Sequence, residues 1–253
     1  MKIAAIAAGM VLLAIALAAG APAALLDARL AEASYGRLRI AGAEGTLWNG
    51  SGELVLLPGG ARRALAWHID AWPALRGELR GTIAPETDPA QPAEFVYGAQ
   101  RAELRHLDLT LPMDNVLLSA GVPAAIAAAG GSIAAHVERL VQTRAALDAQ
   151  LALQWRDASL PGPRPGSRIA LGDVRLDADG TGPEVIATLS NRGGDVEISG
   201  QVVLKAANSP TIDATVRTRP GIDRDRAEAV VAALALIGSP DGQGGYRLAW
   251  PRP

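Results

Sequence analysis

The stretch Ala146–Trp155, ALDAQLALQW, decides the fold class of this chain. Apart from Ala152, its apolar residues from Leu147 to Trp155 occupy every second position. A period of two places successive side chains on opposite faces of a β-strand, whereas an amphipathic helix repeats its apolar residues every three or four positions. The stretch is therefore predicted to be a half-buried strand.

The same alternation recurs on both sides of this stretch, separated by Gly, Pro, Asn or Asp turns. Because the connections are short, successive strands are expected to be mostly antiparallel. The sequence thus predicts a mainly β protein, an extended antiparallel meander or curled sheet of many short strands. The expected strands are Arg37–Ile40, Gly52–Leu56, Arg63–Asp70, Gly77–Arg80, Ala102–Leu111, Ser132–Leu140, Ala146–Trp155, Ile169–Ala178, Glu184–Leu189, Gly194–Ile198, Gly200–Leu204, Thr211–Arg217 and Gly245–Leu248.

Two segments interrupt the strands and are predicted to be helical: Met113–Ala129 and Asp223–Ile237. Asp223 is a suitable N-cap for the second, and Gly238 is expected to end it. Each segment follows a strand and a proline and precedes a glycine-rich turn, which indicates a weak internal duplication. We therefore expect two similar lobes, about 36–155 and 156–253, each with one short helix.

Composition excludes several classes of function. The 253 residues are 49% apolar and 20% charged, which is typical of a chain that buries a core, and the net charge is −2. Basic residues are scattered singly, so no electrostatic footprint for nucleic acid is present. The absence of cysteine excludes disulfides, thiolate nucleophiles and sulfur-ligated zinc.

The N-terminus carries an apolar run from Ile3 to Leu26 without a charged residue. As a helix rising about 1.5 Å per residue, this run can cross a hydrocarbon core of roughly 30 Å. Lys2 favours a cytoplasmic N-terminus. Residues 1–26 are therefore predicted to be a single-pass transmembrane anchor of the bacterial inner membrane, and residues 27–253 a periplasmic β-rich domain.

A cleaved signal peptide is the alternative for this run. Ala21-Pro22-Ala23 and Ala16-Leu17-Ala18 both place small residues at plausible cleavage positions. The run is longer than the roughly 7 to 15 apolar residues usual in signal peptides, which favours a retained anchor. Either interpretation exports the rest of the chain.

No pattern of catalytic or metal-binding residues is present. His68, His106 and His136 are far apart in sequence, each within an alternating strand pattern. The sequence GDVRLDADG around Asp173 and Asp177 lacks the glutamate of a calcium loop and alternates as a strand does. We expect no enzyme, no cofactor and no metal site.

A family resemblance begins at Gly45-Thr46-Leu47-Trp48-Asn49-Gly50, which follows the apolar run and a short linker. Further matching pieces follow in order over nearly the whole chain: Leu65-Ala66-Trp67-His68, Leu75–Leu79, Gly131-Ser132-Ile133, Leu153–Ala158, Leu171-Gly172-Asp173, Leu189–Asp195 and Gly245–Leu248. In their order and spacing these pieces resemble protein N of the type II (general) secretion pathway.

The resemblance implies a non-enzymatic accessory component of the Gram-negative machine that moves folded proteins out of the periplasm. Other secretion subunits in the periplasm or inner membrane would be its partners. We interpret the motif residues as structural, including Trp48, for which a role in partner binding is the less favoured alternative, and Asn49-Gly50, which suits a primed hairpin turn. They are Gly45, Leu47, Trp48, Asn49, Gly50, Trp67, Trp155, Gly194 and Tyr246; Trp72 and Trp250 are likewise expected in the core or at a sheet edge.

A second function class stays open on fold analogy. Curled antiparallel sheets behind a membrane anchor also resemble AsmA-like and lipopolysaccharide-bridge proteins, which hold lipid or another apolar ligand in a groove. The two classes differ in the concave face of the sheet. An unfilled aliphatic trough favours lipid, whereas a face filled by tryptophans and helices favours a docking component.

Overall fold

The computed structural model describes residues 20–57, 60–74, 76–85, 91–113, 129–164, 166–206 and 209–250. Most of the expected membrane anchor, and residues 114–128 of the first expected helix, lie outside these ranges. Among the helices in the described ranges, none combines the length and the apolar character that crossing a membrane requires.

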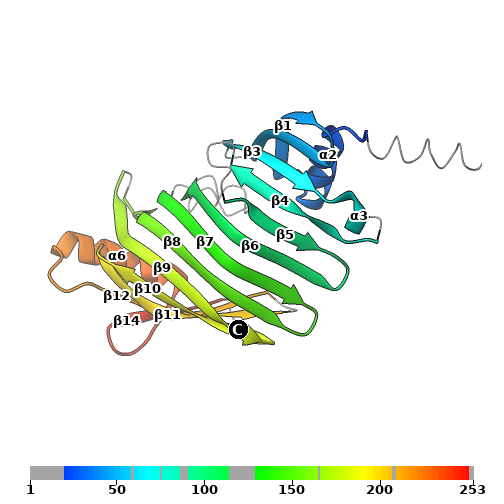
Figure 1. The fold of residues 1–253 in the computed structure, drawn as a ribbon. Helices are drawn as coiled ribbons and strands as arrows, with labels where there is room; N and C mark the ends of the chain where they lie inside the picture. Colours follow the sequence, from blue (N-terminus) through cyan, green and yellow to red (C-terminus); the bar gives the residue numbers. More distant parts are fainter. Residues whose placement is uncertain are drawn as a thin grey trace, which may run out of the picture. The chain divides into compact units, whose positions relative to one another are not determined.

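The described residues confirm the mainly β prediction, with fourteen strands and few helices (Figure 1). The chain forms two compact units, Met1–Ala99 and Gln100–Pro253. The boundary expected between residues 155 and 156 instead falls inside a long strand, β8 (Leu147–Pro161). The trace of a duplication in the sequence therefore does not coincide with the division into compact units.

The first unit is a five-stranded antiparallel meander in the order β1-β2-β3-β4-β5. Helix α2 lies along β1, and the short α3 joins β3 to β4 (Figure 1). The elements are α2 (Ala24–Ala33), β1 (Leu38–Gly45), β2 (Asn49–Leu56), β3 (Ala61–Ile69), α3 (Ala71–Ala74), β4 (Leu79–Pro85) and β5 (Ala93–Tyr97).

The core of the first unit lies between α2 and the sheet. Ile40, Trp67 and Ile69 are buried there with Ala23, and Leu26 and Leu30 of α2 pack against them, as Trp48 does. Helix α2 thus contributes the side chains that cover one face of the sheet.

The second unit has the strand order β6-β7-β8-β9-β10-β11-β12-β14-β13, again antiparallel throughout. Its one described helix follows β12. The elements are β6 (Arg101–Pro112), β7 (Gly130–Thr143), β8, β9 (Arg168–Gly182), β10 (Glu184–Arg192), β11 (Val196–Lys205), β12 (Thr211–Thr218), α6 (Arg224–Ile237), β13 (Ser239–Pro240) and β14 (Gly245–Trp250).

The central strands of this unit are longer than the short strands expected. Strands β7, β8 and β9 have 14, 15 and 15 residues. The pairing of β6 with β7 and of β7, β8 and β9 with one another continues past irregular positions. The residues with positive φ at these positions are His106, Gly131, Asp157 and Gly172. Two predicted strands on either side of Ser199 likewise form the single strand β11, in which Gly200 allows the backbone of Ala214 to approach closely.

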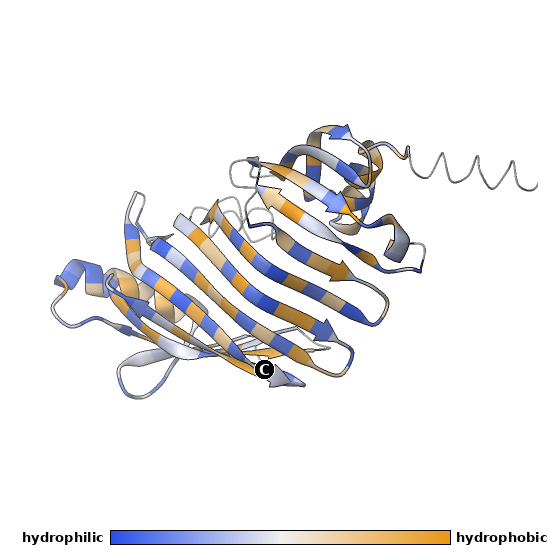
Figure 2. Ribbon diagram, in the orientation of Figure 1, coloured by the Kyte–Doolittle hydropathy of each residue, from blue (hydrophilic) through white to orange (hydrophobic). Residues whose placement is uncertain are grey.

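Hydrophilic and hydrophobic residues alternate along the strands of the second unit (Figure 2). Because successive side chains of a strand point to opposite faces, one face of this sheet is apolar and the other is polar. The apolar side, here the inner face, carries two buried clusters. The first cluster joins Leu140 of β7 to Ile212 of β12, which shows that the sheet curls. A hydrogen bond of 2.6 Å from Gln142 Nε2 to the carbonyl of Ala206 also crosses between distant strands.

Helix α6 closes one end of the inner face. Val230 and Leu234 of α6 are buried against β9, β11 and β12 in the second cluster. As the sequence predicted, Asp223 caps the helix by accepting the N–H of Arg226 at 2.9 Å, and Gly238 ends it. At the other end of the inner face, small residues such as Ala149 and Ala187 are buried in the first cluster.

Candidate docking surface

The Gly45–Gly50 motif forms the turn between β1 and β2. The N–H of Thr46 donates to the carbonyl of Asn49 at 2.9 Å, and the N–H of Asn49 donates to Thr46 Oγ1 at 3.0 Å. Gly45 has φ of +86°, and a Cβ there would lie 2.6 Å from the Asn49 oxygen. Glycine is therefore required at residue 45 by both conformation and space.

The primed-turn interpretation of Asn49-Gly50 is wrong, because both residues belong to β2. Gly50 pairs with Gly45 on one side and with Trp67 on the other. A Cβ on Gly50 would lie 2.5 Å from Cζ2 of Trp67. Glycine at residue 50 thus makes space for the buried indole, whose N–H donates to the carbonyls of Leu47 and Thr46 at 3.2 and 3.3 Å.

The last residues of the apolar run Ile3–Leu26 belong to the folded unit and not to a membrane span. The N–H of Leu47 donates to the carbonyl of Ala21 at 2.8 Å, and the N–H of Ala23 to the carbonyl of Gly45 at 3.3 Å. Ala21 and Ala23 are buried, and Pro22 forms a β-bridge with Thr46. Residues 21–23 are therefore an integral part of the first unit.

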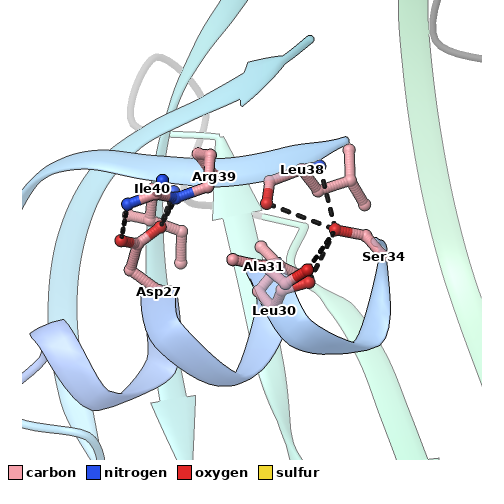
Figure 3. Close-up of polar contacts among 7 residues, drawn as sticks. All are labelled: Asp27, Leu30, Ala31, Ser34, Leu38, Arg39 and Ile40. Atoms are coloured by element: carbon pink, nitrogen blue, oxygen red, sulfur yellow. Dashed lines mark hydrogen bonds and ion pairs between the residues drawn. The ribbon is translucent and has the colours of Figure 1, made fainter. Parts of the chain in front are cut away.

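Helix α2 continues along the outer edge of β1 (Figure 3). The Asp27 carboxylate accepts the main-chain N–H of Ile40 at 2.7 Å and two hydrogen bonds from Arg39, at 2.9 and 2.6 Å. The hydrogen bond from Arg39, with that from Ile40, holds the pKa of the Asp27 carboxyl below its ordinary value. This N–H of β1 is thus bound by a side chain rather than by a further strand.

At the other end of α2, the side chain of Ser34 also binds a main-chain N–H of β1 (Figure 3). Its hydroxyl accepts the N–H of Leu38 at 2.9 Å and donates to the carbonyl of Leu30 at 2.6 Å. With Ala21–Ala23 and Asp27, residues 21–34 bind main-chain groups along the outer edge from Leu38 to Leu47. Such coverage is a known protection against pairing with a foreign strand.

In the second unit, the outermost strand β13 has only two residues, Ser239 and Pro240. It pairs with Arg247 and Tyr246 of β14. A very short edge strand that contains proline offers few main-chain groups for strand addition. Neither of these two edges presents a long unpaired strand within the described residues.

The motif Leu189–Asp195 includes the turn between β10 and β11 and links these two strands to β9. Asn191 Nδ2 donates to the carbonyls of Leu171 and Val196 at 2.6 and 2.9 Å, and the buried Asp195 accepts the N–H of Ala170 at 2.9 Å. Gly194 has φ of +76°, and a Cβ there would lie 2.5 Å from the N atom of Gly172. Glycine at residue 194 therefore permits a close approach of two backbones.

The remaining motif residues pack in the second cluster. Trp155 is half-buried, and its indole N–H donates to the carbonyl of Gly130 at 2.9 Å, while Tyr246 lies on β14 against the same cluster. Trp250 is exposed on β14 near the sheet edge. The expectation for Trp72 is wrong: it lies on the short helix α3 beyond the end of β3 and is exposed.

The polar face of the second unit contains a hollow of about 350 Å³ across β6 to β9. Two small residues, Ala134 and Ala152, form its floor, and long polar side chains surround them. Arg156 and Arg175 each turn Nε toward a neighbouring side chain, Gln154 and Asp177 respectively. The rim is formed by Asp108, His136, Gln154, Arg156 and Arg175.

The three histidines each lie beside a carboxylate. The pairs are His68 with Asp70 at 3.5 Å, His106 with Glu138 at 3.4 Å, and His136 with Asp108 at 2.6 Å. The hydrogen bond and charge of Asp108 raise the pKa of His136. In the ranges described above, no group of three or more His, Asp or Glu side chains is arranged to hold a metal ion.

The family model for type II secretion system (T2SS) protein N matches residues 36–249, which include all fourteen strands apart from the last residue of β14. The chain belongs to the type II secretion system protein N family. This confirms the resemblance seen in the Gly45–Gly50 motif and the pieces that follow it. No curated protein and no solved structure matches the chain.

Sequence reasoning found the motif glycines and tryptophans of this family but missed the residues that cover the β1 edge. Asp27 and Ser34 have no pattern of their own, because each binds a main-chain N–H of β1, and the partner of Arg39 is Asp27, twelve residues earlier. The acidic residue in the first turn of a helix, Asp27, was the one local signal.

Proposed function

We propose that this protein is a non-enzymatic accessory component of the type II secretion system, held in the inner membrane by its N-terminal run, with a periplasmic β domain that docks other secretion subunits. The observation that carries the proposal is the family match across both units. A cytoplasmic N-terminus and a periplasmic body are supported by Lys2 and by the part of the apolar run that precedes the folded unit, residues 3–20.

The packing of the second unit favours docking over a lipid groove. Its inner face holds two buried aliphatic clusters, one of which includes α6. A groove for acyl chains requires apolar surface that no side chains of the protein cover. The hollow of about 350 Å³ lies on the polar face, with a rim of charged side chains and amides.

The same geometry favours docking through a face rather than through an edge. Residues 21–34 bind the outer edge of β1, and the β13 edge is short. On the polar face, the guanidinium groups of Arg156 and Arg175 can form further hydrogen bonds with carboxylates of a partner. We propose that a polar segment of another secretion subunit binds across this face.

Charge reversal on the polar face tests this function. In a strain that lacks the native gene, the double variant Arg156→Glu with Arg175→Glu is expected to reach normal levels yet release less of a folded secreted protein. Arg224→Glu is the matched control, because Arg224 is exposed on α6 and a carboxylate is favourable in the first turn of a helix. Normal secretion by the double variant would refute docking through this face.

A further inference from the structure

One end of the first unit gathers several chain segments. Because neighbouring strands are antiparallel, β1 and β3 end where β2 and β4 begin, and β5 also ends there. The turn at Thr46 and helix α3 lie at this end, which is called the Thr46 end below. The chain enters the unit here as well, since Pro22 forms a bridge with Thr46.

The Thr46 end exposes large apolar side chains. Trp72 of α3 is 75% exposed and Tyr97, the last residue of β5, is 64% exposed. Leu79 pairs directly with Tyr97 across β4 and β5 and is exposed too, as is Leu25 in the first turn of α2. Exposed tryptophan and tyrosine beside exposed leucine are unusual on a surface that faces only water.

The apolar run that precedes the first unit indicates what covers these exposed side chains. The apolar run that ends at Leu26 reaches the folded unit through Ala21–Ala23, and its own residues up to 19 lie outside the described ranges. Tryptophan and tyrosine are favoured at the boundary between hydrocarbon and water, where the ring is buried and the polar group stays hydrated. Arg76, exposed between α3 and β4, can bind lipid phosphates at the same level.

We propose that the Thr46 end of the first unit rests on the periplasmic surface of the membrane, with Trp72 and Tyr97 inserted at the headgroup level. This inference rests on the proposed function, in that it requires a retained membrane anchor. Lipid covers these side chains, because the membrane-spanning run would leave the membrane beside the Thr46 end. The unit is then held at two places, by the anchor and by these aromatic side chains.

The opposite end of the same sheet provides a matched control. Tyr35, in the turn between α2 and β1, is 93% exposed, and Leu57 after β2 is exposed near it. The N–H of Leu57 donates to the carbonyl of Arg37, which places both residues at the end where β1 begins. An aromatic side chain is thus available at each end of one sheet.

The experiment uses single cysteines in the full-length protein, which contains no cysteine of its own. Trp72→Cys, Tyr97→Cys and Tyr35→Cys are labelled with a bimane fluorophore and reconstituted into vesicles of phosphatidylethanolamine with phosphatidylglycerol. Quenching by a lipid that carries a shallow nitroxide is compared with quenching by aqueous iodide. All three side chains are exposed, so the variants are expected to fold.

We expect the lipid-borne nitroxide to quench the probes at 72 and 97 several-fold more strongly than the probe at 35, with the reverse order for iodide. Equal quenching at all three positions, or stronger iodide quenching at 72 and 97, would refute the inference. Extraction of the same vesicles with alkaline carbonate separates this failure from failure of the anchor. A protein that stays with the lipid while its probes face water is anchored but does not rest on the membrane, whereas release of the protein refutes the anchor itself.

Discussion

Gly50 on β2 lies beside the indole of Trp67 on β3, with so little space between them that a Cβ on residue 50 would be 2.5 Å from the ring. In Gly50→Ala the Cβ would also lie 2.5 Å from the carbonyl oxygen of Glu44. This oxygen belongs to the main chain of the paired strand, so rotation of a side chain cannot relieve the contact. We expect the variant to lower the free energy of unfolding by about 1–3 kcal/mol. Urea denaturation of the purified protein measures the change.

The control for this variant is Gly98→Ala in the same unit. A Cβ on Gly98 would have no neighbour closer than 3.7 Å, and its φ is compatible with any residue. Its stability is expected to change by less than about 0.5 kcal/mol. Equal effects of the two substitutions would show that the space beside Trp67 is not what requires glycine.

Among the tryptophans of the first unit, Trp67 is expected to contribute most to stability. Trp67 is 3% exposed with its N–H bonded, whereas Trp48 is half-buried and Trp72 is exposed. Trp67→Ala should cost about 3–5 kcal/mol, Trp48→Ala less, and Trp72→Ala less than about 0.5 kcal/mol. Thermal melting of the three variants tests this order, and a large loss for Trp72→Ala would contradict the assigned exposure.

The first unit is expected to lose stability in acid, because the Asp27 carboxylate becomes protonated. Its pKa is lowered by Arg39 and by the N–H of Ile40, so the contribution is present above the unfolded pKa of about 3.9 and is lost as pH falls through the lower folded value. Asp27→Asn should cost about 1 kcal/mol at neutral pH, since Arg39 is partly exposed. The difference from wild type should vanish at low pH.

Glu32→Gln is the matched control for Asp27→Asn, because Glu32 lies on the same helix but pairs with Arg29 in full contact with solvent. Its effect on stability is expected to be close to zero at every pH. If the two variants lose the same stability, the coverage of the β1 edge by Asp27 is not stabilising.

His136 should titrate above the ordinary value of about 6.5 because Asp108 binds its imidazole. A raised pKa means that the pair stabilises the fold below the unfolded pKa and that this contribution is lost as pH rises through the folded value. Asp108→Asn should return the pKa of His136 toward its ordinary value, as followed by the imidazole proton shifts in NMR. Asp70→Asn, beside His68, should leave His136 unchanged, and an unmoved His136 in Asp108→Asn would contradict the pairing.

The N-terminal segment is expected to remain on the protein. Cleavage after Ala23 would remove the carbonyl of Ala21 that Leu47 binds and the N–H of Ala23 that binds Gly45. The intact mass of the protein extracted from membranes should therefore include residues 1–23, and a chain that begins at Ala19 would show that the segment is cleaved at the other candidate position. A chain that begins at Ala24 would show that these contacts are dispensable.

The sequence predicted the class of fold well because alternation in β-strands depends on which side chains face the core. Leu147–Trp155 follows this rule. The helix was predicted from different signals, the cap at Asp223 and the glycine at residue 238. The length of β8 was underestimated because Asp157 resembles a turn residue, although pairing continues past it. Gly50 was interpreted as a turn residue because the side chain that requires glycine there, the indole of Trp67, lies on the next strand.

The candidate surfaces could be predicted only in part. The motif residues are visible in sequence, yet the exposure of Trp72 depends on α3 leaving the sheet after β3. The hollow on the polar face requires that Ala134 and Ala152 be placed on neighbouring strands, and this depends on the register of β7 and β8. This register includes an irregularity between Val137 and Arg139, which no local pattern in the sequence marks.

The central claim, that the polar face docks other secretion subunits, is tested most directly by crosslinking in cells. A photoreactive residue is placed at Gln154 and at His136 on this face, and at the exposed Arg144 between β7 and β8 as a control. With the other secretion genes intact, we expect protein adducts with type II secretion subunits from positions 154 and 136 and few from position 144. Adducts only with phospholipid or lipopolysaccharide at 154 and 136 would contradict it.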